Sequence, residues 1–349
     1  MRKGDSVEWF VAGFPGAAAE EDIDGVHVVR AGKQATVHLH AMRRYRRSLA
    51  SRFDVVIDEV NTIPFFTPLW SPIPSLLLIF QLAREVWWHE SPFPISALGY
   101  AAEPGYLRAY RRTPAMTISA STENDLRRLG FRAPITVLPI GLEAMVIPEV
   151  AREPVTTFLY VGRMAPSKRV HDIIEAFAIF RRAGRDGRLW LVGDGPEAYL
   201  RTLRKRAATL GLANDVEFLG RLASDEKHAR MARAHVLLMA SVREGWGLSI
   251  AEAGACGTPA VVYDVPGLRD AVRSGETGLV VAPSPEGMAR GMAELIADPS
   301  RYERIASEAR RWSATFSFDA AADAMRAVIT ATVAGAPRKS GTPAPASGP

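Results

Sequence analysis

Twelve short apolar segments alternate with helix-compatible stretches, and this alternation limits the possible folds of the chain more than any other feature. The segments are rich in β-branched residues or leucine and are bounded by Gly, Pro or Asp. Strands that are buried on both faces and separated by helices form parallel α/β sheets. The expected strands are Val7–Val11, Val26–Arg30, Asp54–Ile57, Ser75–Phe80, Ala115–Ser119 and Ile135–Pro139, then Thr156–Val161, Arg188–Val192, Val216–Leu219, His235–Met239, Ala260–Tyr263 and Gly278–Val281.

The alternation restarts after GLEAMVIPEVAREP (141–154), whose prolines and lack of period indicate a linker. A chain of 349 residues exceeds the size at which single cores usually stop growing, so we expect two domains. We predict an α/β protein with two doubly wound, Rossmann-like domains facing a cleft, where ligands bind at the carboxyl ends of strands. The expected boundaries are 1–141 for the first domain, 142–154 for the linker, 155–317 for the second domain, 318–333 for a helix packing back towards the first domain, and 334–349 for a disordered tail.

Composition narrows the class of protein. The 43 basic and 38 acidic residues give a net charge of +5, and no Lys/Arg tract indicates a nucleic-acid groove. The single cysteine, Cys256, excludes an internal disulfide and favours a reducing cytoplasm.

Residues 65–83 carry no charge over about the length of a membrane span. Their prolines at 68, 72 and 74 favour a loop that enters a buried strand.

The stretch SVREGWGLSIAEAGACGTPAVVYD (241–264) carries two glutamates at the start of an expected helix. Gly245 and Gly247 let the backbone approach a ligand, and a helix beginning near Leu248 aims free N–H groups at anionic oxygens. Glu244 precedes the helix, and Glu252 lies roughly 6 Å along its axis at 1.5 Å per residue. This arrangement suits a ligand with hydroxyls at both ends and phosphates between them. The alternative, a solvated loop glutamate and an exposed helix glutamate, stays open for this stretch taken alone.

Three further signals follow strands of the same domain. In YVGRMAPSKR (160–169), Arg163 and Lys168 suit a diphosphate, although alone they are also compatible with two solvated cations. LVGDGPEAYL (191–200) matches a dinucleotide fingerprint, but it follows the second strand of its domain, where a glycine turn beside another ligand is the better interpretation. FLGRLASDEK (218–227) is an ordinary loop before a helix, with Ser224 as the expected N-cap.

These motifs together resemble a known family. EGWGLSIAEAGACGTPAVV is similar to the E-x7-E signature of retaining glycosyltransferases of the GT-B fold, family 4, with VGRMAPSKR, LVGDGP, FLGR and SGETGLVV in the expected order. The match covers the second domain, from Thr156 to about Asp298, and the first domain matches more loosely.

The resemblance implies a donor site for a nucleoside-diphosphate sugar in the second domain. Arg163 and Lys168 would hold the diphosphate, Glu244 a sugar hydroxyl and Glu252 the ribose, with no cofactor and no metal. Arg163, Lys168 and Glu244 are the expected catalytic residues; the expected donor-binding residues are Gly162, Gly195, Leu222 near the base, Gly245, Trp246, Gly247, Leu248 and Glu252. A uracil and a guanine base are both compatible with this set.

The chain departs from the family pattern in three places. The histidine that commonly follows the fourth strand of the first domain is replaced by Phe80 and Gln81, and Gln81 is a candidate substitute. The usual Pro-Asn-Gly reads Pro139-Ile140-Gly141. Residues 2–16 resemble the end of the family's first helix and its second strand, so we expect a first strand, glycine-rich loop and helix upstream of Met1. Without that central strand, the strands on either side of it should lack their partner.

The first domain is expected to bind the acceptor, a glycan or lipid-linked molecule. Trp87 and Trp88 are candidates for stacking on a sugar or for the bilayer surface, with core packing of at least one as the alternative. The arginines at 43, 44, 46 and 47 suit anionic lipid, and a solvated helix face is equally compatible. His38, His40 and His89 lack the companions of a metal site.

The sequence thus predicts a cytoplasmic, metal-independent, retaining glycosyltransferase of cell-envelope or polysaccharide synthesis, with contact at the inner face of the membrane left open. Its partners are a nucleotide-sugar donor and a glycan or lipid-linked acceptor, and nucleic acid is not expected. The alternatives are a non-catalytic or crippled sugar-nucleotide-binding protein and, more remotely, an NAD-dependent oxidoreductase.

Overall fold

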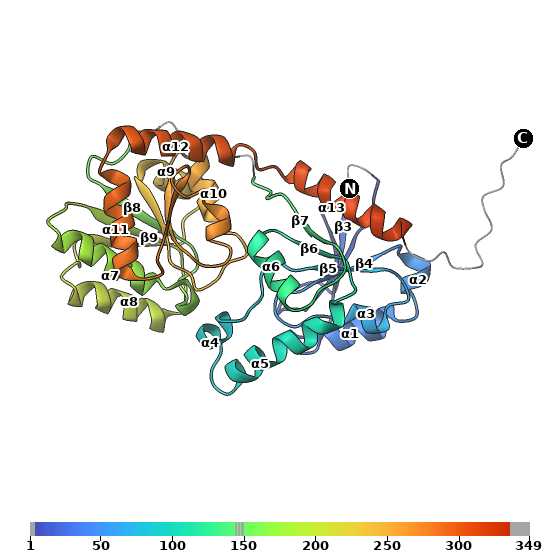
Figure 1. Cartoon of the computed structure of the whole chain (residues 1–349). Helices are drawn as coiled ribbons and strands as arrows, with labels where there is room; N and C mark the ends of the chain where they lie inside the picture. The colour runs from blue at the N-terminus through green and yellow to red at the C-terminus, as the bar shows by residue number, and fades with distance from the viewer. Residues whose placement is uncertain (1–3, 144, 146, 148–149, 336–349) are drawn as a thin grey trace, which may run out of the picture.

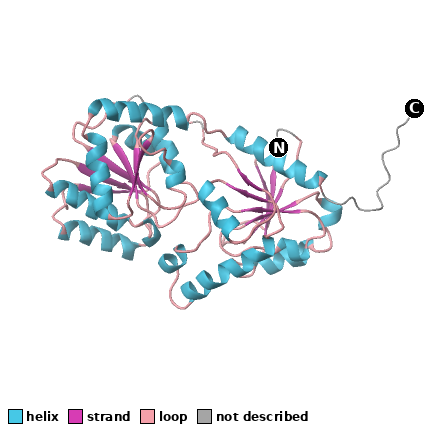
Figure 2. Ribbon diagram, in the orientation of Figure 1, coloured by secondary structure: helices cyan, strands magenta, loops and turns pink. Residues whose placement is uncertain are grey.

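The computed structural model describes residues 4–143, 145, 147 and 150–335. Figure 1 and Figure 2 show two α/β domains, each with strands enclosed by helices. Both domains are therefore of the predicted Rossmann-like type. Strands lie at all twelve predicted places, with ends that shift by a few residues: Asp54–Ile57, for example, is observed as Val56–Glu59.

The C-terminal domain holds a single parallel sheet of six strands in the order β10-β9-β8-β11-β12-β13. The chain moves outward from β8 to β10 and then returns to the other side of β8, so the order reverses between β8 and β11. Ligands of doubly wound sheets bind at the carboxyl ends of strands beside such a reversal. The strands are β8 (Thr157–Val161), β9 (Arg188–Val192), β10 (Val216–Gly220), β11 (Val236–Met239), β12 (Ala260–Tyr263) and β13 (Gly278–Val281).

Helices connect these strands and bury one face against the sheet. Helix α7 has one apolar face, whose five members Val170, Ile173, Ile174, Phe177 and Phe180 are all buried. The resulting apolar core is continuous through the domain. The helices are α7 (Val170–Arg182), α8 (Glu197–Thr209), α9 (Ser224–Arg233), α10 (Leu248–Ala255), α11 (Pro285–Ile296) and α12 (Pro299–Ser313), with short 3-10 turns η2 (Pro166–Lys168) and η3 (Arg269–Ala271).

The N-terminal domain has two separate sheets among the described residues. One is parallel, in the order β4-β5-β6-β7; the other has the order β1-β3-β2. The strands are β1 (Glu8–Val11), β2 (Glu20–Ile23), β3 (Val26–Arg30), β4 (Val56–Glu59), β5 (Ser75–Leu78), β6 (Ala115–Thr117) and β7 (Ile135–Val137).

Strand β2 was not predicted, and it corrects the expectation of purely parallel sheets. Its residues, Glu-Glu-Asp-Ile, are all exposed, so no apolar pattern marks it. It pairs antiparallel with β3 through a tight turn at Asp24 and Gly25, both with positive φ, a typical Asp-Gly hairpin.

Three small apolar clusters replace a continuous core in the N-terminal domain. Its helices are α1 (Val37–Tyr45), α2 (Leu49–Arg52), α3 (Thr67–Trp70), α4 (Val86–Glu90), α5 (Ile95–Leu107) and α6 (Ala120–Arg128), followed in the case of α5 by the 3-10 turn η1 (Arg108–Tyr110). Residues 65–83 form α3, a loop and β5. Among the described residues, none of the helices combines the length and apolar composition of a membrane span.

The last helix, α13 (Phe318–Ala334), returns to the N-terminal domain and lies along it in Figure 1. Its Ala324, Met325, Val328 and Ile329 pack against β5 and β6. Ala334 is still helical, and residues 336–349 of the predicted tail lie outside the described residues.

Candidate active site

Glu244 and Glu252 lie on either side of the amino terminus of α10. Helix α10 begins at Leu248, where it was predicted, and Gly247 before it has a φ of +99°. This left-handed backbone conformation favours glycine, and a Cβ there would also lie 2.9 Å from Ile250 Cδ1. The first amides of α10 are thereby free to bind an anion.

Lys168 and Glu244 are brought together at the reversal point of the sheet. Lys168 follows β8 and Glu244 follows β11, and Lys168 Nζ lies 2.5 Å from Glu244 Oε1. Ser241 Oγ donates to the same oxygen at 2.7 Å. Their side chains are only 20% and 13% exposed, so this ion pair is well shielded from water.

Arg163 does not join that pair but meets a carboxylate of the N-terminal domain. Its Nη1 lies 3.0 Å from Oε2 of Glu90 at the end of α4, and Ser167 Oγ donates to the other oxygen of Glu90. Burial alone would raise the pKa of Glu90, but the hydrogen bonds from Ser167 and Arg163 hold that pKa below its usual value. Glu90 and Ser167 were not predicted from the sequence as residues of the site.

Glu252 lies on the second turn of α10, and its partner comes from α9. Lys227 Nζ is 2.9 Å from Glu252 Oε1, and each side chain is 22% exposed. Lys227 lies on α9 and was not predicted from the sequence as a site residue. Leu222, in the same loop, packs partly against the C-terminal core. Ala223, rather than the predicted Ser224, is the N-cap of α9, which makes no side-chain cap bond.

Glycines let the loops after β8 and β9 touch. A Cβ on Gly193 would overlap Gly162 O, and one on Gly195 would overlap Met164 O. Close packing of two strand-end loops therefore explains the glycines of the dinucleotide-like motif. β9 is the second strand of the domain, as predicted, so the motif is not in the first βα turn.

The loop before α10 also contacts the N-terminal domain. A Cβ on Gly245 would lie 3.2 Å from Phe80 O, just after β5, and Gln81 Oε1 is buried without a hydrogen-bond partner. The Trp246 ring packs on Trp312 and Phe316.

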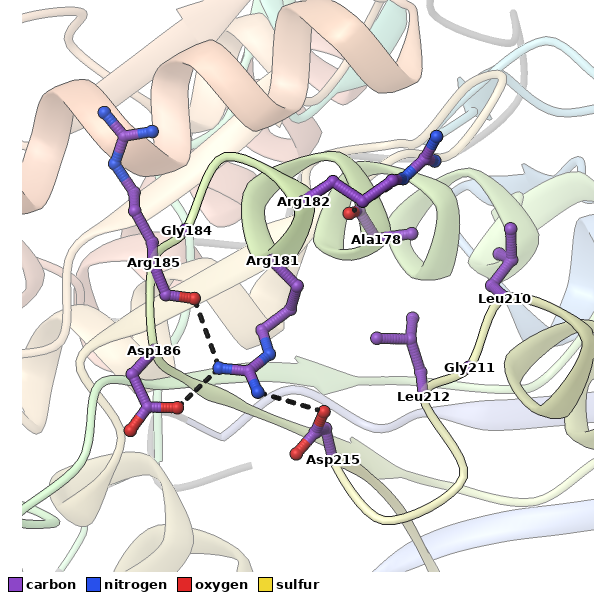
Figure 3. A pocket seen from close by; sticks show the side chains of 10 residues that line it. All are labelled: Ala178, Arg181, Arg182, Gly184, Arg185, Asp186, Leu210, Gly211, Leu212 and Asp215. Atoms are coloured by element: carbon purple, nitrogen blue, oxygen red, sulfur yellow. Dashed lines mark hydrogen bonds and ion pairs between the residues drawn. The ribbon is translucent and has the colours of Figure 1, made fainter.

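A cavity of about 440 Å³ lies away from this site. Figure 3 shows Arg181 there, paired with Asp186 and Asp215. These residues precede β9 and β10, so they lie at the amino ends of the strands, whereas the predicted site lies at the carboxyl ends. The ends of α7 and α8 also meet here, and arginines commonly neutralise such carboxyl ends.

The residues predicted to bind the acceptor differ in exposure and in their contacts. Trp87 packs against Gly99 of α5, whereas Trp88 is 51% exposed and lies over Tyr100. Arg44 of the arginine cluster pairs with Glu20 at 2.7 Å. Within the described part of the chain, no group of three His, Cys, Asp or Glu side chains is arranged to hold a metal.

Residues 147–312 match the family model described as Glycosyl transferases group 1, a little under half of the chain. A glycogen synthase from Mycobacterium tuberculosis (strain CDC 1551 / Oshkosh) is 34% identical over 228 residues, covering 63% of this chain and 54% of the relative. A D-inositol 3-phosphate glycosyltransferase from Rhodococcus opacus (strain B4) is 37% identical over 181 residues, covering 50% and 40%. The chain thus spans about half the length of the curated relatives it matches.

Solved structures resemble a larger part of the chain. Sucrose-phosphate synthase from Thermosynechococcus elongatus gives a TM-score of 0.77 at 19% identity, covering 96% of this chain and 91% of that one. HepE of Anabaena, in complex with UDP and glucose, gives 0.66 at 20% identity, covering 84% and 81%. The fold is therefore that of two Rossmann-like domains, as in GT-B glycosyltransferases, and the C-terminal half resembles glycosyltransferases in sequence as well.

Proposed function

We propose that this chain is a retaining, metal-independent glycosyltransferase that moves a sugar from a nucleoside-diphosphate donor to a glycan or lipid-linked acceptor. One observation carries the proposal: Lys168 and Glu244 meet at the reversal point of the C-terminal sheet, beside the free amino terminus of α10. The similarity of residues 147–312 to group 1 glycosyl transferases supports it.

The donor would lie along the start of α10. The amides of Trp246, Gly247 and Leu248 lie at the positive end of the helix, where they would donate hydrogen bonds to the phosphates. Glu252, held by Lys227, accepts hydrogen bonds from the ribose hydroxyls, and Glu244 accepts one from the sugar. The UDP in the complexes of HepE supports a nucleotide donor of this kind.

Cleavage of the donor leaves negative charge on the departing diphosphate. Lys168 and the helix terminus are preorganised positive groups that stabilise this charge in place of a metal ion, and Arg163 adds a further positive charge. Arg163 must first exchange Glu90 for phosphate, since the two side chains are paired. We assign the catalytic role to Arg163, Lys168 and Glu244 on this basis.

The N-terminal domain would bind the acceptor. The exposed Trp88 offers a stacking face for a sugar, and the arginines at 43, 44, 46 and 47 offer charge to an anionic membrane at the inner leaflet. A cell-envelope or polysaccharide acceptor and a cytoplasmic location follow as parts of the same proposal.

The test is incubation of the purified chain with UDP- and GDP-sugars and a panel of glycan and lipid-linked acceptors. We expect transfer that persists in EDTA, and an anomeric proton signal in NMR spectra that reports retention at the transferred carbon. Nucleotide binding without transfer or donor hydrolysis would instead favour a non-catalytic binding protein. Binding of NAD in preference to nucleoside diphosphates would favour the oxidoreductase.

A further inference from the structure

Arg243, directly before Glu244, extends from the C-terminal domain to two carboxylates of the N-terminal domain. Its Nε lies 2.9 Å from Glu85 Oε2 and its Nη1 lies 2.6 Å from Asp125 Oδ2. The Arg243 side chain is 8% exposed, and that of Asp125 is 17% exposed. Burial would lower the pKa of Arg243, but the bonds to Asp125 and Glu85 outweigh burial and keep it charged.

The two carboxylates are themselves held in place. Glu103, buried on α5, accepts from the amides of Ala83 at 2.6 Å and Arg84 at 2.7 Å, directly before Glu85. Arg84 adopts a left-handed φ of 34°, a strained conformation that persists only where the surroundings fix it. The segment that presents Glu85 is therefore rigid.

Asp125 belongs to a helix that the C-terminal domain also anchors. The Ser121 amide near the start of α6 donates to Asp270 Oδ1 at 3.0 Å, and Asp270 lies in η3 of the C-terminal domain. Helix α6 is thus held from the C-terminal domain at two points: near its start by Asp270 and about one turn later by Arg243.

The backbone around Arg243 belongs to the candidate site. The amide of Val242 donates to Ser167 O at 2.8 Å, in the turn that carries Lys168, and the amide of Glu244 donates to Pro266 O at 3.0 Å. Arg243 lies between these two bonds. Any shift of its side chain therefore acts on the loop that carries Glu244.

We propose that Arg243 is a positioning residue: it couples docking of the N-terminal domain to the placement of Glu244 beside the donor. This inference rests on the proposed function. When Glu85 and Asp125 hold Arg243, Gly245 is seated against Phe80 and Glu244 faces Lys168. When the domains separate, the loop loses this support, so catalysis is confined to the docked state.

A stabilising role alone does not account for the arrangement. Removal of one partner of a buried ion pair lowers the stability of the folded state, whereas a misplacement of about 1 Å in a catalytic group can cost about a hundredfold in rate. The two roles therefore predict different results for Arg243→Met.

The experiment compares wild-type protein with Arg243→Met, Arg243→Lys, Asp125→Asn and the double variant Arg243→Met/Asp125→Asn. The control is Arg301→Met, which removes an ion pair confined to the C-terminal domain. Titration calorimetry with UDP and GDP, turnover with the donor sugar, and small-angle X-ray scattering are measured on each folded protein.

We expect Arg243→Met to keep nucleotide affinity within about threefold of wild type while turnover falls by about ten- to a hundredfold. Arg243→Lys should recover part of this loss, and the double variant should lose little more than Arg243→Met, because coupled residues are not additive. The radius of gyration should rise in Arg243→Met and stay unchanged in Arg301→Met.

Wild-type turnover in folded Arg243→Met, or an equal loss of nucleotide affinity and turnover, would overturn the positioning role. An unchanged scattering profile in that variant would overturn the coupling of the domains. If wild-type protein itself turns over no donor, the proposed function fails, and scattering alone still decides whether Arg243 holds the domains together.

Discussion

The two domains bury their apolar residues in different ways. The C-terminal domain buries one continuous core around a six-stranded parallel sheet, whereas the N-terminal domain distributes its apolar residues over three clusters and two sheets. The groups proposed to bind the donor lie almost wholly on the domain with the continuous core. A site that needs fixed geometry is thus built on the more rigid support.

The charges across the boundary are also divided between the domains. The N-terminal domain supplies Glu85, Glu90 and Asp125, and the C-terminal domain supplies their partners Arg163 and Arg243. From this division we expect changes in the C-terminal domain to affect nucleotide binding and chemistry strongly. Changes in the N-terminal carboxylates should act on nucleotide binding only weakly.

The largest effect is expected for Lys168→Ala, which removes a positive charge at the reversal point of the sheet. Turnover should fall by about a hundredfold or more, the scale of losing one preorganised electrostatic donor. Steady-state kinetics on folded protein measure this, with Lys205→Ala on the exposed face of α8 as the matched control. Turnover close to wild type in Lys168→Ala would remove the proposed role.

A smaller effect is expected for Gly247→Ala, measured against Gly211→Ala. Both glycines have positive φ, at 99° and 76°, so each substitution should destabilise the protein by about 1–2 kcal/mol. Only Gly247 precedes α10, so only Gly247→Ala should weaken nucleotide binding, by about tenfold or 1.4 kcal/mol. Thermal unfolding and calorimetry check the pair, and equal nucleotide affinities in the two variants would argue against a donor at this helix terminus.

The smallest effect is expected for Glu90→Gln in the N-terminal domain. Its carboxylate competes with the donor phosphates for Arg163, and partly exposed ion pairs contribute about 0–1 kcal/mol, so nucleotide affinity should rise by at most about fivefold. Glu123→Gln, which removes a pair internal to α6, is the control. A loss of affinity in Glu90→Gln would mean that Glu90 helps to form the site rather than competing for it.

Sequence patterns predicted the C-terminal domain well for a physical reason. Strands buried on both faces are continuous apolar runs in the sequence. Helix α10 begins at the predicted residue, and α7 buries its apolar face. Strand β2 was missed because it is acidic and exposed, so no periodic burial marks it. Its only sequence signal is the Asp24-Gly25 turn.

The candidate site was predictable only in part. Lys168, Glu244 and Glu252 follow strands or begin a helix, positions at which parallel sheets gather their functional groups. The partner of Glu252, Lys227, lies 25 residues away on another helix. The interdomain contacts Arg163–Glu90 and Arg243–Glu85 span 73 and 158 residues. Such contacts leave no local pattern, because no periodicity links the two partners.

The most direct test of the account is calorimetric titration of wild-type, Glu244→Ala and Glu252→Ala proteins with a nucleoside diphosphate and with the corresponding nucleotide sugar. The account places the ribose at Glu252 and the sugar at Glu244, on opposite sides of the α10 amino terminus. Glu252→Ala should therefore weaken both ligands, whereas Glu244→Ala should weaken the nucleotide sugar much more than the nucleotide. Equal losses of affinity for the bare nucleotide in both variants would contradict the two-ended donor site.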